Sequence, residues 1–123
     1  SRGLGDVYKR QDERLVPPNH PDNNFFIAHQ TLFCNLDITN KQIHPIRTDR
    51  DPENCAQDYE RHLRKFFKLQ DQQWPVLDLV LLGMGSDGHT ASLFPGSNVL
   101  NEKVRLVAAS WIPKLGSIIY HQA

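Results

Sequence analysis

Apolar positions with helical spacing follow a proline-rich loop near the start of the chain. Apolar or aromatic residues recur there every three or four positions, as one buried side of a helix requires. These residues are Phe25, Ala28, His29, Leu32 and Phe33. Asn23 or Asn24 can accept hydrogen bonds from the first N–H groups of such a helix. The pattern predicts a helix over residues 24–34.

A second helical pattern is longer. Pro52 and Glu53 suit a first helical turn, because proline lacks the N–H that this turn leaves unpaired. The apolar stripe behind them consists of Ala56, Tyr59, Leu63, Phe66 and Phe67. The opposite side is charged, so the pattern predicts a helix over residues 52–68 that packs one face on a core. We expect Met84 and Phe94 in the core as well.

Three shorter segments predict strands. Residues 76–82 are almost continuously apolar, as in a strand covered on both faces, and Gly83 ends this run. Residues 104–110 predict a second buried strand. Residues 42–46 alternate weakly and contain Pro45, which suits an edge strand.

The remaining segments predict loops. Residues 1–11 show no periodic pattern, and we expect no structure in them. Residues 12–22 are polar and carry three prolines, which predicts an extended loop. A helical turn is expected over residues 90–94. Helices that alternate with apolar strands predict an α/β fold with a mostly parallel sheet flanked by helices.

Composition and charge exclude several function classes. The 123 residues allow one domain at most. Lys plus Arg (14) balance Asp plus Glu (14), so no basic excess favours nucleic acid or an anionic membrane, and any phosphate site must be local. No stretch approaches the ~20 apolar residues that span a bilayer. We expect a cytoplasmic monomer.

The two cysteines predict neither disulfides nor a metal site. Cys34 and Cys55 are too few for a disulfide framework or a four-ligand zinc site, and neither lies in a Cys-x-x-Cys pair. We expect both to be reduced, buried thiols. The chain also lacks a histidine pair with metal-ligand spacing, so we expect no metal and no cofactor.

The loop that follows the predicted strand 76–82 is the candidate site. It contains Gly83, Gly85 and Gly88, and open α/β sheets bind ligands beyond the ends of their strands. Glycines let the backbone approach a ligand closely, and N–H groups at a helix start can bind an anion or an oxyanion. A tight turn without chemistry is the alternative interpretation.

Two known glycine-containing motifs match this loop only in part. The glycines satisfy the dinucleotide-binding pattern G-x-G-x-x-G, but that pattern expects an acidic residue about 20 residues later, and residues 104–111 contain none. A nucleophile elbow of the form G-x-S-x-G would need glycine in place of Met84.

His89 is the candidate catalytic residue of the loop. It follows the third glycine, where the helical turn is expected to begin. A helix N-terminus disfavours the imidazolium, so we expect His89 to be neutral near pH 7 and able to act as a general base. A packing or surface histidine is the alternative. Asp87 could orient His89 or instead brace the backbone of the loop, and both readings stay open.

Residues 81–96 (LLGMGSDGHTASLFPG) closely resemble the signature of 6-phosphogluconolactonases. The resemblance implies the glucosamine-6-phosphate isomerase-like fold, which is also described as ribose-5-phosphate isomerase/CoA transferase-like. It implies His89 as the base, with Asp87 beside it. The substrate would contact Gly83, Gly85, Gly88 and Thr90. The related glucosamine-6-phosphate deaminases share Asp-Gly-His but continue differently after it.

Two further elements resemble the same family. Asp12-Glu13-Arg14 and the residues 22–25 are similar to its Asp-Glu-Arg and Ser-Asn-Tyr elements, which implies that Arg14 reaches the active site. A surface ion pair of Arg14 with Asp12 or Glu13 is the alternative. Lys114 follows a proline, as in a later family element, which implies a contact with the 6-phosphate. An exposed lysine is the alternative there.

The resemblance covers residues 12–116 and implies a partial lactonase domain. Residues 1–11 and 117–123 are expected to be foreign to the family, whose members are about twice as long. The implied function is hydrolysis of 6-phosphoglucono-δ-lactone to 6-phosphogluconate in the oxidative pentose phosphate pathway, without metal or cofactor. A sugar-phosphate isomerase or deaminase of the same fold and an inactive fragment of a lactonase are the alternatives.

Overall fold

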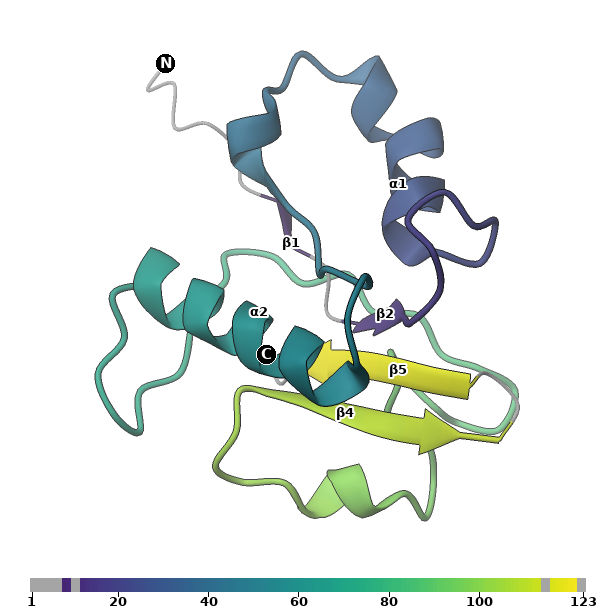
Figure 1. Cartoon of the computed structure of the whole chain (residues 1–123), viewed down its shortest axis with the longest axis vertical. Coiled ribbons are helices and arrows are strands. Elements are labelled where there is room, and N and C mark those ends of the chain that lie inside the picture. The colour runs from purple at the N-terminus through teal and green to yellow at the C-terminus, as the bar shows by residue number, and fades with distance from the viewer. Residues whose placement is uncertain (1–7, 10–11, 114–115, 122–123) are drawn as a thin grey trace.

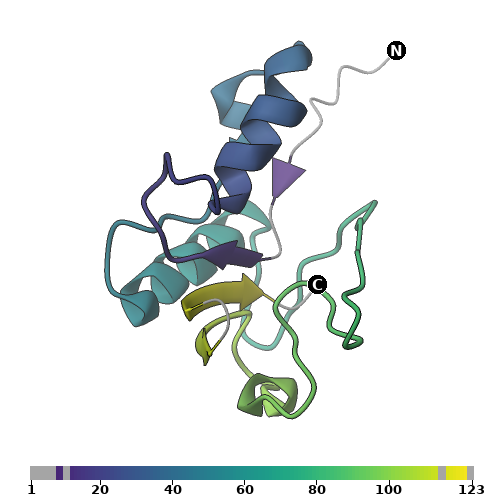
Figure 2. The same ribbon diagram turned by 90° about the vertical axis from the view of Figure 1, so that its right-hand side faces the viewer.

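Figure 1 shows the computed structural model of the chain, which describes residues 8–9, 12–113 and 116–121. A three-stranded sheet has the spatial order β2-β5-β4. The bounds of these strands are Asp12–Arg14 for β2, Gly116–His121 for β5 and Val107–Ile112 for β4. Helix α2 (Pro52–Phe66) packs against β4 and β5. Helix α1 (Asn24–Thr31) lies beyond the β2 side of the sheet (Figure 2).

The described strands do not form a mostly parallel sheet, so that prediction was wrong for them. β5 pairs antiparallel with both β2 and β4. Only residues 113–115 separate β4 from β5, and a connection this short lets the chain fold back but not cross over to a parallel position. β1 (Tyr8–Lys9) and β3 (Ile43–His44) form a separate parallel pair. The mixture of helices and strands itself was predicted correctly.

Both predicted helices are present. α1 begins where expected and is followed by a 3-10 turn, η1 (Phe33–Asn35). The Asn23 side chain accepts a hydrogen bond from the Phe26 N–H at 2.8 Å and so caps the helix. α2 begins directly after its cap Asp51. Two more 3-10 turns, η2 (Asn40–Gln42) and η3 (Asn98–Asn101), lie in connecting segments.

The core lies between α2 and β4. Its buried members are Ile46, Cys55, Ala56, Tyr59, Leu63, Leu106 and Val107. The predicted stripe on α2 is therefore confirmed except at its end, where Phe66 is 40% exposed. Met84, expected in the core, is 83% exposed. Cys34 is exposed too, because it lies on the outside of η1, where its thiol contacts the Gln30 carbonyl.

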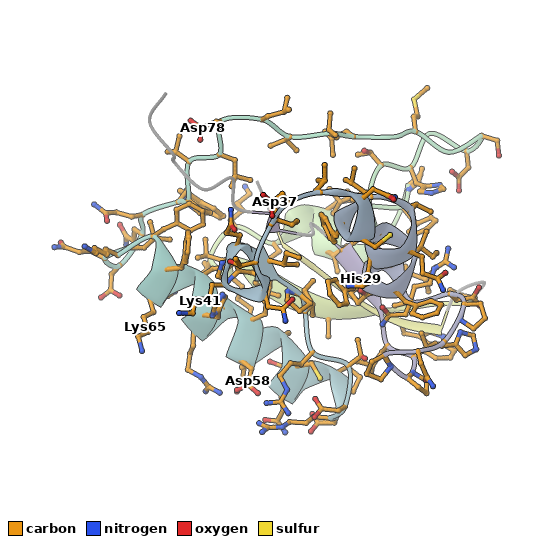
Figure 3. The ribbon with its side chains drawn as sticks, turned by 90° about the horizontal axis from the view of Figure 1, so that it is seen from above. His29, Asp37, Lys41, Asp58, Lys65 and Asp78 are labelled. Atoms are coloured by element: carbon orange, nitrogen blue, oxygen red, sulfur yellow. The ribbon has the colours of Figure 1, made fainter. Side chains whose placement is uncertain are left out.

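The predicted buried strand 76–82 is the largest error of the sequence analysis. These residues form no helix and pair with no strand among the described residues, and the chain bends at Asp78. Val76, Leu79 and Leu81 are 75–85% exposed. An apolar run becomes a buried strand only where neighbouring strands take its N–H and C=O groups and other elements cover its faces, and no described element does either. Figure 3 shows Asp78 of this segment on the opposite margin of the molecule from Asp58 of α2.

The other strand predictions hold in part. β3 confirms the short strand expected within residues 42–46. The strand expected over residues 104–110 is shifted, since β4 begins at Val107 while Val104 is 80% exposed. The loop expected over residues 12–22 starts instead with β2, because Asp12–Arg14 pair with β5. The expectation for residues 1–11 falls largely outside the described residues, of which Tyr8–Lys9 are strand. Within the described part, no helix has the length and apolar character needed to cross a membrane.

Glu13 is a fully buried carboxylate at the centre of β2. Its Oε1 accepts hydrogen bonds from the N–H groups of Asn24 at 2.6 Å and of Arg14 at 2.9 Å. Its Oε2 accepts the N–H of Phe25 at 2.9 Å. The negative charge thus lies at the N-terminus of α1, where unpaired N–H groups favour it. Glu13 fixes α1 to β2, a role that the sequence analysis missed.

We expect Glu13→Gln to destabilise the fold by about 2 kcal/mol, because an amide carries no charge and offers one acceptor oxygen instead of two. Urea unfolding followed by circular dichroism measures this loss. The control is Asp37→Asn, which changes an exposed carboxylate and should leave the unfolding curve in place. Equal effects of the two variants would contradict the role of Glu13.

A second pair of variants tests which leucines form the core. Leu63 is 1% exposed and Leu81 is 85% exposed. Leu63→Ala should cost about 2–5 kcal/mol of unfolding free energy, since it leaves a cavity, whereas Leu81→Ala should change it by less than about 0.5 kcal/mol. A large loss from Leu81→Ala in the same denaturation experiment would show that residues 76–82 are packed after all.

Candidate active site

The glycine loop, residues 83–90, is closed by hydrogen bonds between its two ends. The Thr90 hydroxyl donates to the Gly83 carbonyl at 2.8 Å, and the Gly85 N–H donates to the His89 carbonyl at 2.8 Å. Inside the loop the Gly88 N–H donates to the Gly85 carbonyl at 3.0 Å. Gly88 has a φ of 85°, a left-handed conformation that glycine adopts without strain. The sequence therefore specifies a compact turn that ends at His89.

The His89 side chain is held on three sides. A Cβ atom at Gly85 would overlap the imidazole, so the ring needs glycine at that position. The ring of Phe94 stacks on His89, with centroids 4.3 Å apart and planes 21° apart. Asp87 Oδ1 contacts His89 Nδ1. When the proton on Nδ1 is directed to this carboxylate, Nε2 is left to accept a proton, as a general base requires.

Asp87 makes both contacts that the sequence left as alternatives. Besides the ring contact, its Oδ1 accepts the backbone N–H of His89 at 3.1 Å. The pKa of the Asp87 carboxyl lies below its ordinary value, first because of the hydrogen bond with the His89 side chain and then because of that with the backbone. The carboxylate form is thus the one that the loop stabilises.

The segment after His89 is a tight turn and not the predicted helical turn. The Leu93 N–H donates to the Thr90 carbonyl at 2.9 Å, and Ala91 has a φ of 48°, which ends any helical path. No helix begins at His89 in the described residues, so the prediction of a helix N-terminus there was wrong. The N–H groups of Gly85, Gly88 and His89 are also paired within the loop, so in this conformation they do not point outward as anion donors.

Ser92 connects this loop to β2. It is 2% exposed, and its hydroxyl donates to Asp12 Oδ2 at 2.8 Å. The bond joins the two sequence elements that resemble the lactonase family, the glycine loop and Asp-Glu-Arg. Sequence reasoning missed Ser92, although its position inside the signature was a signal.

Arg14 lies on β2 with its side chain 33% exposed. Its Nη1 is 3.8 Å from Asp22 Oδ1, whereas the sequence offered Asp12 or Glu13 as partners. An ion pair of this length and exposure contributes little, so the guanidinium can exchange this partner for an anionic ligand. Lys114, the other expected anion contact, falls outside the described residues.

Two hollows of the described chain lie away from the glycine loop. One of about 420 Å³ lies between β3 and α2, and His44 and Tyr59 are among its lining residues. The other, of about 240 Å³, is lined partly by Pro18 and Ile46. The His89 side chain itself is 31% exposed. Among the described residues, no group of three His, Cys, Asp or Glu side chains could hold a metal ion.

Comparison with known proteins places this geometry in a family. The model of the family "Glucosamine-6-phosphate isomerases/6-phosphogluconolactonase" matches residues 9–116, which include β2 and the glycine loop. The chain belongs to the glucosamine-6-phosphate isomerase/6-phosphogluconolactonase family. The described α/β arrangement is thus a part of that family's fold.

Curated members of this family include enzymes similar to the chain. It is 45% identical over 97 residues to a 6-phosphogluconolactonase of Nostoc sp. The aligned region covers 78% of this chain and 40% of that protein. It is 42% identical over 97 residues to the 6-phosphogluconolactonase of Rattus norvegicus. Here the aligned region covers 79% of this chain and 37% of that protein. The chain spans about two-fifths of the length of these relatives.

Solved structures of 6-phosphogluconolactonases resemble the described fold of the chain. The 6-phosphogluconolactonase from Trypanosoma brucei superposes with a TM-score of 0.78 at 29% identity, over 91% of this chain and 50% of that one. The enzyme from Trypanosoma cruzi gives 0.82 at 30% identity, over 95% and 50%. The chain corresponds to about half of each solved structure.

The contact between Asp87 and His89 can be tested by titration. We expect carbon NMR to give Asp87 a pKa below its ordinary 3.8, and His89→Ala to return the pKa towards that value. Because the folded pKa is lowered, the contact is present above the ordinary pKa and is lost as the pH falls through the lowered one.

Asp49 provides the control for this titration. Its pKa is lowered as well, chiefly by the hydrogen bond from Arg47, and it should not respond to His89→Ala. An Asp87 pKa that stays low in the variant would show that the backbone bond alone holds the carboxylate.

Proposed function

We propose that this segment carries the catalytic base of a 6-phosphogluconolactonase. The observation that supports the proposal most is His89 Nδ1 held by Asp87 inside the signature loop, in a chain 45% identical to an enzyme of that name. The substrate would be 6-phosphoglucono-δ-lactone and the product 6-phosphogluconate.

In the proposed reaction His89 Nε2 takes a proton from water as the water oxygen attacks the lactone carbonyl carbon C1. The tetrahedral oxyanion formed there needs positive charge or hydrogen-bond donors. The bond from C1 to the ring oxygen then breaks, and His89 returns its proton to that oxygen. Asp87 holds the imidazole in the tautomer that this exchange needs.

Arg14 is proposed to bind the oxyanion or the 6-phosphate, because its planar guanidinium can donate several hydrogen bonds to either anion. Lys114 is proposed for the 6-phosphate on the family resemblance alone. Gly85 and Gly88 are proposed to shape the surface that the substrate approaches, since their N–H groups are engaged within the loop. Gly83 and Thr90, which are joined by a hydrogen bond, are proposed to contact the substrate where the loop begins and ends.

The proposal keeps the expectation of a monomer in the cytoplasm, although a relative from Arabidopsis thaliana is named chloroplastic. The alternative of a deaminase or isomerase is disfavoured by residues 90–95, which contain no acidic residue to protonate a substrate. The alternative of an inactive fragment is supported by the chain's coverage of about half of the solved relatives.

The direct test measures consumption of the lactone by the chain and by His89→Ala. We expect the chain to exceed the spontaneous rate and His89→Ala to lose about 100-fold or more of the enhancement, since a general base contributes this much. His29→Ala is the control, because Figure 3 shows His29 on α1 and its side chain is exposed.

Two results would contradict the proposal. A chain no faster than spontaneous hydrolysis would support the inactive fragment. An active chain that is unchanged by His89→Ala would remove His89 from the base role. Release of ammonia from glucosamine 6-phosphate would instead support the deaminase.

A further inference from the structure

We propose that Ser92 is a positioning residue: its hydrogen bond to Asp12 holds the His89 loop on the face of β2 from which Arg14 projects. The inference rests on the proposed function for its catalytic meaning. Its structural part can be measured without activity.

The hydrogen bond from Ser92 to Asp12 is long-range and partly buried. Ser92 and Asp12 are 80 positions apart in sequence, and Ser92 is 2% exposed. A buried hydroxyl needs a partner, and a carboxylate acceptor makes the bond stronger than a neutral one. Removing the Asp12 carboxylate leaves the buried Ser92 hydroxyl without this partner, which costs more than the bond itself contributes.

The other hydrogen bonds of the loop are local. Thr90 bonds to Gly83, and the backbone bonds inside the loop also join residues of the loop itself. Among the hydrogen bonds described for residues 83–93, the one from Ser92 to Asp12 alone reaches another part of the chain. Met84 gives no apolar anchor, since it is 83% exposed. The described hydrogen bonds thus connect the loop to the rest of the fold through Ser92.

The attachment point is itself well fixed. β2 pairs with β5 at all three of its positions, and Glu13 binds it to α1. Side chains alternate along a strand, so Asp12 and Arg14 share one face while Glu13 points to the other. The intermediate–buried–intermediate exposure of the three residues agrees with this alternation. The bond therefore places the loop on the face that presents the guanidinium.

This geometry separates the roles of the two catalytic candidates. Arg14, the proposed anion contact, lies on β2, and β2 stays fixed without Ser92. His89, the proposed base, lies in the loop, and the loop loses its fixed position without Ser92. Loss of the Ser92 hydroxyl should therefore misplace the base and leave anion binding intact. A serine that served only to stabilise the fold would affect both through global unfolding.

The first experiment is amide hydrogen exchange followed by NMR on the chain and on Ser92→Ala. We expect exchange at Gly85, Gly88 and His89 to become about tenfold faster, while amides of α2 around Leu63 keep their rates. Ser92→Thr retains the hydroxyl and should restore the loop rates. The matched control is Ser97→Ala, which removes a hydroxyl bonded locally to the Phe94 carbonyl.

Loop rates unchanged in Ser92→Ala would overturn the inference, and so would equal acceleration of loop and α2 amides. Asp12→Ala should reproduce the effect of Ser92→Ala, and the double variant should add little to either. Additive effects of the two substitutions would show that they act through different contacts and would likewise overturn it.

The second experiment addresses catalysis. In an active preparation Ser92→Ala should lower kcat for the lactone by ten- to a hundredfold, because small misplacements of a base are costly, while KM stays within about twofold. Ser92→Thr should recover most of kcat. A rise in KM at constant kcat would contradict the separation of roles. A chain without activity would refute the proposed function, while the exchange experiment would still decide the role of Ser92.

Discussion

The described fold depends on one buried charge, the carboxylate of Glu13. A carboxylate without water is costly unless hydrogen bonds replace its hydration, and three backbone N–H groups do so here. Two of them begin α1, so the charge cannot stay satisfied unless β2 and α1 meet in this arrangement. The residues on either side of Glu13 then point to the opposite face of β2, and this face is where the candidate site lies.

The candidate site combines a fixed strand with a self-contained loop. The hydrogen bonds within residues 83–90 and the Phe94 ring hold the imidazole of His89 without help from distant elements. The chain corresponds to about half of each solved structure. The described residues thus bring together the proposed base, His89, and the guanidinium of Arg14.

The sequence predicted features that depend on neighbouring residues. α2 followed from Pro52 and its apolar stripe, and the glycine loop was recognisable from its three glycines and the signature of residues 81–96. Features that depend on distant partners were missed. The polar triplet Asp12–Arg14 has no strand pattern, and only β5 and α1 explain its structure. The run 76–82 has a strand pattern, but burial requires neighbours that the pattern cannot supply.

The central claim is that Arg14 on β2 and His89 in the loop act on one substrate as a unit. A double-mutant cycle on lactone hydrolysis tests it most directly, with His89→Ala, Arg14→Ala and the double variant compared by kcat/KM. Residues that act as a unit in catalysis have strongly non-additive effects, whereas independent contacts add. The account predicts that each single variant loses most of the rate enhancement and that the double variant loses little more. Losses that multiply independently, or a full rate in either single variant, would contradict it.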